Sequence, residues 1–227
     1  MLAPGFYSPA MKTFFTALVM LVAAWMQMPW AAAQAVLSPS AVAGAGQLDA
    51  GFAKKIAEAI GANRLSRTDL SSPKGSGGNE TMSEGGVLVG FEFFETRSNN
   101  FPDIRSLRPY YLTPSGIKAG EDRGRCEKIT NKVLARPGYA VAGINVYHID
   151  PKGRIQGIQV IFMKMVPGAA RLDHDPASTY RSLWYGAIPR KEKPKELGGD
   201  GRPVVGVYAS AERTATTSAW CRCRIEW

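Results

Sequence analysis

Histidine and cysteine are scarce in this sequence. Its 227 residues include two histidines, His148 and His174, and three cysteines. The sequence has neither a nucleophile elbow nor an H-E-x-x-H zinc motif, the patterns with which several hydrolase classes place a nucleophile or a metal. We therefore expect a protein that is not an enzyme and that carries no cofactor.

One histidine stands beside two carboxylates, in the stretch Asp173-His174-Asp175-Pro176. Neighbouring side chains of an extended segment point in opposite directions, so at most two of these three could share an ion without a sharp turn. The stretch is therefore predicted to form a surface turn before Pro176, and no metal site is predicted.

The three cysteines are Cys126, Cys221 and Cys223. Cys221 and Cys223 are two residues apart in a predicted strand, so their side chains point to one face and cannot comfortably bridge each other. Either of them could meet Cys126 from a neighbouring strand. We expect one disulfide and one free thiol, because a C-x-C metal site would need further ligands with suitable spacing.

Long apolar runs are missing except near the N-terminus. Lys12 precedes an apolar run from Phe14 to Trp30, and Ala33-Gln34-Ala35 fits the small-residue pattern of a cleavage site. Residues 1–35 are therefore predicted to be a signal peptide, with Met11 as an alternative start. An uncleaved anchor helix is the other interpretation. We expect a secreted, periplasmic or extracellular protein that has no membrane span after cleavage.

Basic residues outnumber acidic ones, with 28 Lys and Arg against 19 Asp and Glu and a formal net charge of +9. A positive charge on an exported protein can favour polyanions. The basic residues are scattered, however, and the densest run, from Arg190 to Glu196, is interrupted by acids and a proline. We interpret the charge as a solubility feature and expect no nucleic-acid partner.

Residues 48–60 carry apolar side chains at helical spacing, which predicts an amphipathic helix that stops at Gly61. The apolar side chains belong to Leu48, Phe52, Ile56, Ala59 and Ile60. Residues 71–86 are rich in glycine and serine and are predicted to be a flexible linker. Residues 36–83 thus form a segment that holds the helix and the linker.

An internal repeat runs through the remainder of the chain. Its pattern is a glycine, two variable residues, two aliphatic residues, a second glycine and one apolar residue. The copies are Gly85–Phe91, Gly138–Ile144 and Gly201–Val207. A second short apolar strand follows each copy, at residues 104–107, 155–158 and 217–220, which predicts three hairpins. The recurrent glycines predict either close backbone approach or a positive φ at the same place in each unit.

The stretch from Leu197 to Tyr208, where glycines bound an apolar run, is similar to the last-unit strand of jacalin-like lectins. The resemblance covers residues 84–227 and implies a β-prism-like fold, a threefold array of four-stranded units; a β-trefoil is the alternative. It also implies glycan binding, without a metal, by loops at one end of the prism. The chain further resembles uncharacterised exported bacterial proteins.

In that family an aspartate at the start of a returning strand accepts hydrogen bonds from the sugar. The corresponding positions of this chain hold Arg105, Gln156 and Ser218. The resemblance therefore implies a site that takes its sugar contacts from other groups in the hairpin loops.

Candidate ligand-binding residues stand in the three predicted hairpin loops. They are Asn99, Asn100 and Asp103 in the first loop, Asp150 in the second, and Glu212 and Arg213 in the third. In the first loop, amides and a carboxylate flank an aromatic ring, and sugar sites typically combine such groups. The alternative is simple turn chemistry, for which the same residue types are also suited.

The sequence thus predicts a mainly β, exported protein with a short N-terminal helix that binds a glycan or a cell-surface polysaccharide without catalysis. The alternative is a structural or protein-interaction module of the cell envelope that binds no sugar. In that case its loops and sheet edges would contact another protein chain.

Overall fold

The structure is a computed structural model, and it describes residues 46–66, 68, 79–83, 85–98, 101–124, 131–148, 155–190, 193–213 and 219–226. The chain divides into the units Met1–Ala43 and Gly44–Trp227, so all described residues belong to the second unit. The predicted signal peptide, residues 1–35, lies outside the described residues. No helix within these ranges has both the length and the apolar character that a membrane span requires.

Helix α2 extends from Ala50 to Gly61, which confirms the predicted helix. Asp49 caps its first turn, because the Asp49 carboxylate accepts a hydrogen bond of 2.9 Å from the amide of Phe52. Phe52 and Ile56 are 1% and 3% exposed, so the apolar side of the helix is buried against the rest of its own unit.

The end of α2 differs from the prediction, which made Gly61 the stop. The chain leaves the helix at Asn63, whose φ is 50°. The amide of Asn63 donates to the carbonyl of Ile60, and the amide of Arg64 donates to the carbonyl of Ala59. These two bonds form a Schellman motif, in which asparagine takes the left-handed position usually filled by glycine.

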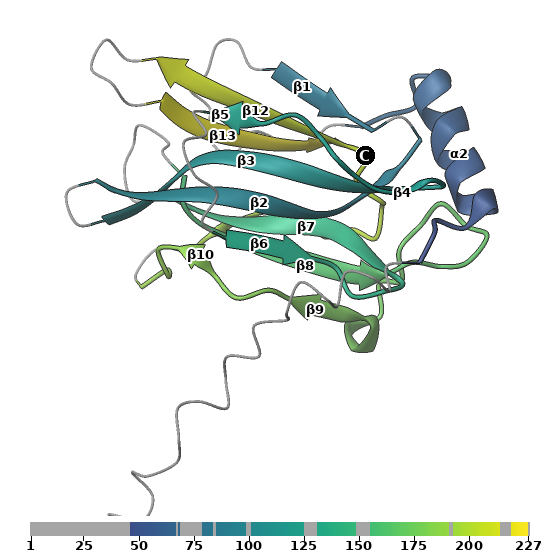
Figure 1. Ribbon diagram of the computed structural model, residues 1–227. Helices are drawn as coiled ribbons and strands as arrows, with labels where there is room; N and C mark the ends of the chain where they lie inside the picture. Colours follow the sequence, from purple (N-terminus) through teal and green to yellow (C-terminus); the bar gives the residue numbers. More distant parts are fainter. Residues whose placement is uncertain are drawn as a thin grey trace, which may run out of the picture. The chain divides into compact units, whose positions relative to one another are not determined.

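The strands form three antiparallel sheets (Figure 1), and each sheet contains one long hairpin. The first sheet has the order β4-β3-β2-β6, with β5 also paired to β3. Its strands are β2 (Val87–Ser98), β3 (Phe101–Thr113), β4 (Gly116–Ala119), β5 (Arg123–Gly124) and β6 (Asn131–Leu134).

The second sheet has the order β10-β8-β7-β11, with β9 also paired to β8, and the third has the order β1-β12-β13. The strands of the second sheet are β7 (Tyr139–His148), β8 (Ile155–Lys164), β9 (Thr179–Arg181), β10 (Tyr185–Gly186) and β11 (Lys195–Gly198). Those of the third are β1 (Asn79–Met82), β12 (Gly206–Arg213) and β13 (Ala219–Glu226).

Each repeated motif leads into the first strand of one hairpin, so the three predicted hairpins are confirmed. The first glycine of every copy has a positive φ: 77° at Gly85, 81° at Gly138 and 82° at Gly201. The prediction of a positive φ at the same place in each unit is therefore also confirmed, and this conformation explains why glycine recurs there.

A second backbone feature recurs just before the second glycine of each copy. Val89 and Ala142 are bulged residues, and their carbonyls accept hydrogen bonds of 2.7 and 2.8 Å from the amides of Ala135 and Gly199. Val205 stands at the same place in the third copy, and its carbonyl accepts a 2.9 Å bond from the amide of Ser83. The same device therefore joins a further chain segment to each hairpin.

The motif residues divide between two buried clusters. The central cluster receives one large apolar side chain after the second glycine of each copy, from Phe91, Ile144 and Val207. The helix cluster combines Phe52, Ala53 and Ile56 of α2 with Val89, Ala142 and Val205 of the three motifs. Helix α2 therefore covers the beginnings of all three hairpins.

The fold is mainly β, as predicted, but the segment 36–83 is more structured than a helix followed by a linker. Asn79–Met82, inside the predicted linker, form β1 and pair with β12 from Gly206 to Ala209. The helix also lies in the same compact unit as the sheets. β1 was missed because its four residues show no alternation and follow a glycine-rich run.

Candidate functional site

The far ends of the three hairpins, where the first strand of each stops, point away from α2. β2, β7 and β12 begin at the helix cluster and run away from it, and Figure 1 shows α2 at the right and the far ends of these strands at the left. The tips connect Ser98 to Phe101, His148 to Ile155, and Arg213 to Ala219. The three segments that the sequence suggested for ligand binding therefore each follow a strand that runs away from α2.

The structure describes only some of the candidate ligand-binding residues. Asn99, Asn100 and Asp150 belong to the tips and lie outside the described residues. Glu212 and Arg213 are the last two residues of β12, paired with Trp220 and Ala219, so their backbone stands at the tip of the third hairpin.

Asp103 does not lie in a loop. It belongs to β3, where it pairs with Thr96, and its side chain is only 1% exposed. Its carboxylate lies 3.8 Å from the guanidinium of Arg105. The predicted loop over residues 98–103 is shorter than expected, because β3 already begins at Phe101.

Glu95 joins two sheets near the same end. Its Oε1 accepts hydrogen bonds from the Gly186 amide of β10 at 3.0 Å and from the Asn131 side chain of β6 at 2.7 Å. Burial raises the pKa of Glu95 above its usual 4.5, and the two hydrogen bonds offset this only in part. Tyr185 packs beside it against Phe93, with ring centroids 5.1 Å apart.

A row of charged residues crosses the first sheet. Glu92 of β2 is directly opposite Arg108 of β3 and Lys132 of β6. Its carboxylate lies 3.3 Å from the Arg108 guanidinium and 3.1 Å from the Lys132 amine. Arg108 also binds Asp122, and that bond raises the pKa of Arg108. These cross-strand pairs stabilise the sheet.

The stretch from Asp173 to Pro176 forms the predicted surface turn. The Asp173 carboxylate accepts hydrogen bonds from the Asp175 amide at 3.1 Å and from the Ser178 hydroxyl at 2.7 Å. The Asp175 side chain caps the short 3₁₀ helix η3 (Pro176–Ser178). Among the described residues, no three His, Cys, Asp or Glu side chains are grouped as metal ligands would be.

Cys221 and Cys223 both lie in β13, which confirms the predicted strand. They pair with Ala211 and Ala209 of β12. Cys126 lies outside the described residues, two positions after the end of β5. The disulfide therefore stays a prediction.

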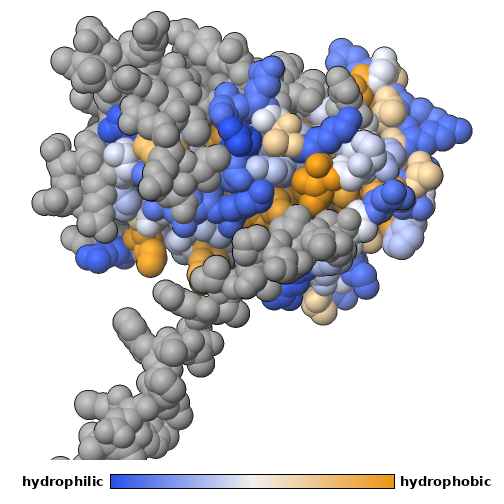
Figure 2. Space-filling model, viewed as in Figure 1, coloured by the Kyte–Doolittle hydropathy of each residue, from blue (hydrophilic) through white to orange (hydrophobic). Residues whose placement is uncertain are grey.

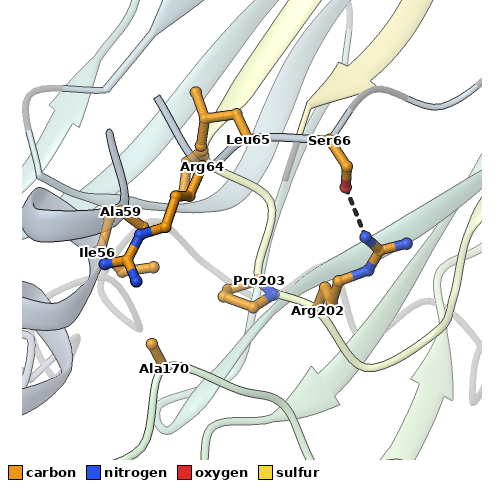
Figure 3. A pocket seen from close by; sticks show the side chains of 9 residues that line it. Ile56, Ala59, Arg64, Leu65, Ser66, Ala170, Arg202 and Pro203 are labelled. Atoms are coloured by element: carbon orange, nitrogen blue, oxygen red, sulfur yellow. Dashed lines mark hydrogen bonds between the residues drawn. The ribbon is translucent and has the colours of Figure 1, made fainter. Parts of the chain in front are cut away.

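A pocket of about 280 Å³ lies at the opposite end, beside the end of α2 (Figure 3). We call it the α2 pocket. Its lining residues are Ile56, Ala59, Arg64, Leu65, Ser66, Ala170, Arg202, Pro203 and Val205. Most of these side chains are apolar, and none of them is acidic.

Two arginines lie on either side of Pro203 in this pocket. Figure 3 shows the Arg64 guanidinium beside Ile56 and Ala59, and Arg202 on the other side. The Arg202 guanidinium donates to the Ser66 hydroxyl at 2.5 Å and to the Asp200 carboxylate at 2.7 Å. Burial raises the pKa of Asp200, but the bonds from Arg202 outweigh it and leave that pKa below its usual value.

Among the residues coloured in Figure 2, hydrophilic ones predominate, and apolar residues gather at a few separate points. Two large apolar side chains are strongly exposed within the described part of the chain: Leu183 at 78% and Ile188 at 66%. Both flank β10. Exposed apolar side chains of this size are candidates for contact with another protein.

The sequence matches no protein-family model, and no curated protein is significantly similar to it. Sequence reasoning missed the α2 pocket, because Arg64 and Arg202 come from distant segments that only the fold brings together. The one available signal was Arg202 itself, a charged residue inside the third repeated motif.

Proposed function

We propose that this chain is an exported, noncatalytic binding protein that recognises a glycan through the three hairpin tips. The observation that carries the proposal is the common direction of the hairpins, which run from α2 to one end. Binding loops held at one end of a rigid sheet scaffold are a general arrangement for recognition.

The proposal includes a β-prism-like fold for the domain. Three features support it: one hairpin in each of three sheets, a positive-φ glycine at the start of each motif, and an equivalent backbone hydrogen bond in each copy. The separation of the hairpins into different sheets favours a prism over a β-trefoil. The first two sheets also flank their hairpins with strands on both sides.

The expected sugar contacts come from the tips. Asn99 and Asn100 stand between β2 and β3, Asp150 between β7 and β8, and Glu212 and Arg213 at the end of β12. Amide, carboxylate and guanidinium groups can together donate and accept the hydrogen bonds that sugar hydroxyls need. Asp103 is buried beside Arg105, so we assign it to the support of β3 and not to direct contact.

A glycan array probed with the full chain at low and high salt tests the proposal. We expect selective binding that persists at high salt, because hydrogen bonds to neutral sugars depend little on screening. Binding only to acidic glycans, and only at low salt, would attribute the signal to net charge. The absence of glycan binding at both salt concentrations would refute the proposal.

A variant pair locates the site. Replacing Asn99 and Asn100 together by alanine should weaken binding roughly tenfold, the effect of losing one or two hydrogen bonds. Gln47→Ala is the matched control, since Gln47 is an exposed amide beside α2 at the other end of the unit. Equal binding by the double variant and the control would exclude the first tip from the site.

A second candidate is a protein-interaction module of the cell envelope. The exposed Leu183 and Ile188 beside β10 favour it, as does β13, which has a described neighbour on one side only. The double change Leu183→Ser and Ile188→Ser should then reduce association with a partner or a second copy in analytical ultracentrifugation. Glycan binding would be unchanged in that variant.

A further inference from the structure

The end of α2 builds the α2 pocket from two backbone features. The left-handed conformation of Asn63 turns the chain out of the helix, and Arg64, Leu65 and Ser66, which follow it, contribute to the pocket lining. The segment from Arg202 to Val205 forms the facing wall, and it is fixed there by the third repeated motif. Both walls therefore rest on ordered backbone hydrogen bonds.

The polar groups that line the α2 pocket are mainly hydrogen-bond donors. The lining offers two guanidinium groups and one hydroxyl above an apolar surface, and it contains no carboxylate. A neutral sugar needs acceptors as well as donors, whereas an organic anion needs donors and positive charge. The α2 pocket therefore suits a negatively charged ligand with an apolar body.

The two arginines are not equivalent. Arg202 is already held by Asp200 and Ser66. Within the part of the chain that the structure describes, no carboxylate lies at ion-pair distance from Arg64, whose guanidinium stands beside Ile56 and Ala59 (Figure 3). None of the described carboxylates therefore competes with a ligand for the Arg64 guanidinium.

We propose that the α2 pocket binds a small organic carboxylate, with the carboxylate on Arg64 and the apolar body against Ile56, Ala59 and Pro203. The planar guanidinium can bind a carboxylate through two parallel hydrogen bonds. At about 30 Å³ for each water-sized group, the pocket volume accommodates on the order of ten non-hydrogen atoms, the size of an aromatic acid. This site is separate from the hairpin tips and independent of glycan binding.

Nuclear magnetic resonance titration of the full, ¹⁵N-labelled chain tests this site. The probes are 2-naphthoate and its neutral match 2-naphthamide, which has the same shape without the charge. We expect 2-naphthoate to shift the amides of Ile56, Ala59, Arg64, Ser66 and Val205 in a saturable way, and 2-naphthamide to bind at least fivefold more weakly. Phenyl phosphate serves as a third probe. If it binds more tightly than 2-naphthoate, the preferred ligand is a phosphate ester, and the proposed carboxylate class is wrong.

Two variants distinguish a specific ion pair between Arg64 and the ligand from a general effect of the protein's net charge. Arg64→Ala should weaken 2-naphthoate at least fivefold, while Arg190→Ala, which removes the same charge from an exposed residue on the loop after β10, should leave its affinity unchanged. The proposal would be overturned if 2-naphthoate and 2-naphthamide bound equally well, or if the two variants lost affinity for 2-naphthoate equally. It would also be overturned if no saturable shifts appeared in the α2 pocket. Because the comparison of the two probes uses the unaltered chain, it holds even if Arg64→Ala folds poorly.

Discussion

Gly90 and Gly143 lie in different sheets, and each faces a backbone carbonyl oxygen that leaves no room for a side chain. A Cβ atom on Gly90 would lie 2.1 Å from the carbonyl oxygen of Val133, and one on Gly143 would lie 2.6 Å from that of Leu197. Both oxygens belong to the backbone of an adjacent strand, β6 or β11, so they cannot move aside as a side chain could. In the first two copies of the repeat, steric crowding therefore explains the second glycine.

We predict that Gly90→Ala and Gly143→Ala each lower the free energy of unfolding by about 1–3 kcal/mol, the usual cost of overpacking. Urea unfolding of the full chain measures the change. Gly61→Ala is the control, because a Cβ there would have nothing within 4 Å. Gly61→Ala lies in the last turn of α2, where alanine favours the helix more than glycine does. This change should therefore raise the free energy of unfolding, by up to about 1 kcal/mol. Unchanged stability of both strand variants would contradict the steric explanation.

A pH-dependent prediction follows from Glu95. Its pKa in the folded protein is raised above 4.5, mainly by burial, so ionisation of the carboxyl opposes folding. This cost is absent below pH 4.5, where the group is protonated in both states, and it develops as the pH rises through the folded pKa. Glu95→Gln removes the charge and keeps an oxygen that can accept from Gly186 and Asn131.

We therefore expect Glu95→Gln to be at least as stable as the parent protein at pH 7, with the difference fading as the pH falls toward 4.5. Urea unfolding at a series of pH values measures both proteins. Glu58→Gln, on the exposed side of α2, is the control for loss of one negative charge. A difference that grows on acidification would show that the ionised carboxylate of Glu95 stabilises the fold.

Local patterns were enough to predict much of the fold. The spacing of apolar residues predicted α2, and the glycine repeat predicted the three hairpins together with their positive φ angles. Each of these features depends on residues that are close in sequence. Long-range pairing leaves no such local signal, which is why β1 and its partner β12 were not predicted.

The candidate sites show the same limit. Asp103 was expected in a loop because asparagine, proline and aspartate favour turns, but the connection between Ser98 and Phe101 is short and Asp103 is buried in β3. The α2 pocket depends on the meeting of Arg64 with the segment around Pro203. Neither the burial of a side chain nor a contact between distant segments is encoded in a local pattern.

Asn63 provides a test of how α2 ends. Its φ of 50° is unfavourable for most side chains, and asparagine tolerates it better than alanine does. Asn63→Ala should lower the free energy of unfolding by about 1 kcal/mol, whereas Asn63→Gly should keep or raise it. Urea unfolding distinguishes the two variants. Equal stability of the alanine and glycine forms would argue against the Schellman motif.

The predicted disulfide would join β13 to the segment that follows β5. β5 ends at Gly124 and lies against both β12 and β13. Cys126 follows Gly124 by two residues, and two residues span at most about 7 Å. We therefore expect the bridge to join Cys126 to Cys221 or Cys223.

Alkylation of the unreduced, denatured protein followed by mass spectrometry should therefore give one adduct, and alkylation after reduction should give three. Cys126→Ala should give two adducts without reduction, because residues two apart in a strand, such as Cys221 and Cys223, are not expected to bridge each other. Reduction of the parent protein should also lower its free energy of unfolding by about 2–4 kcal/mol, since the bridge closes a long loop. Three adducts from the unreduced parent protein would show that Cys126 has no partner and that β13 carries two free thiols.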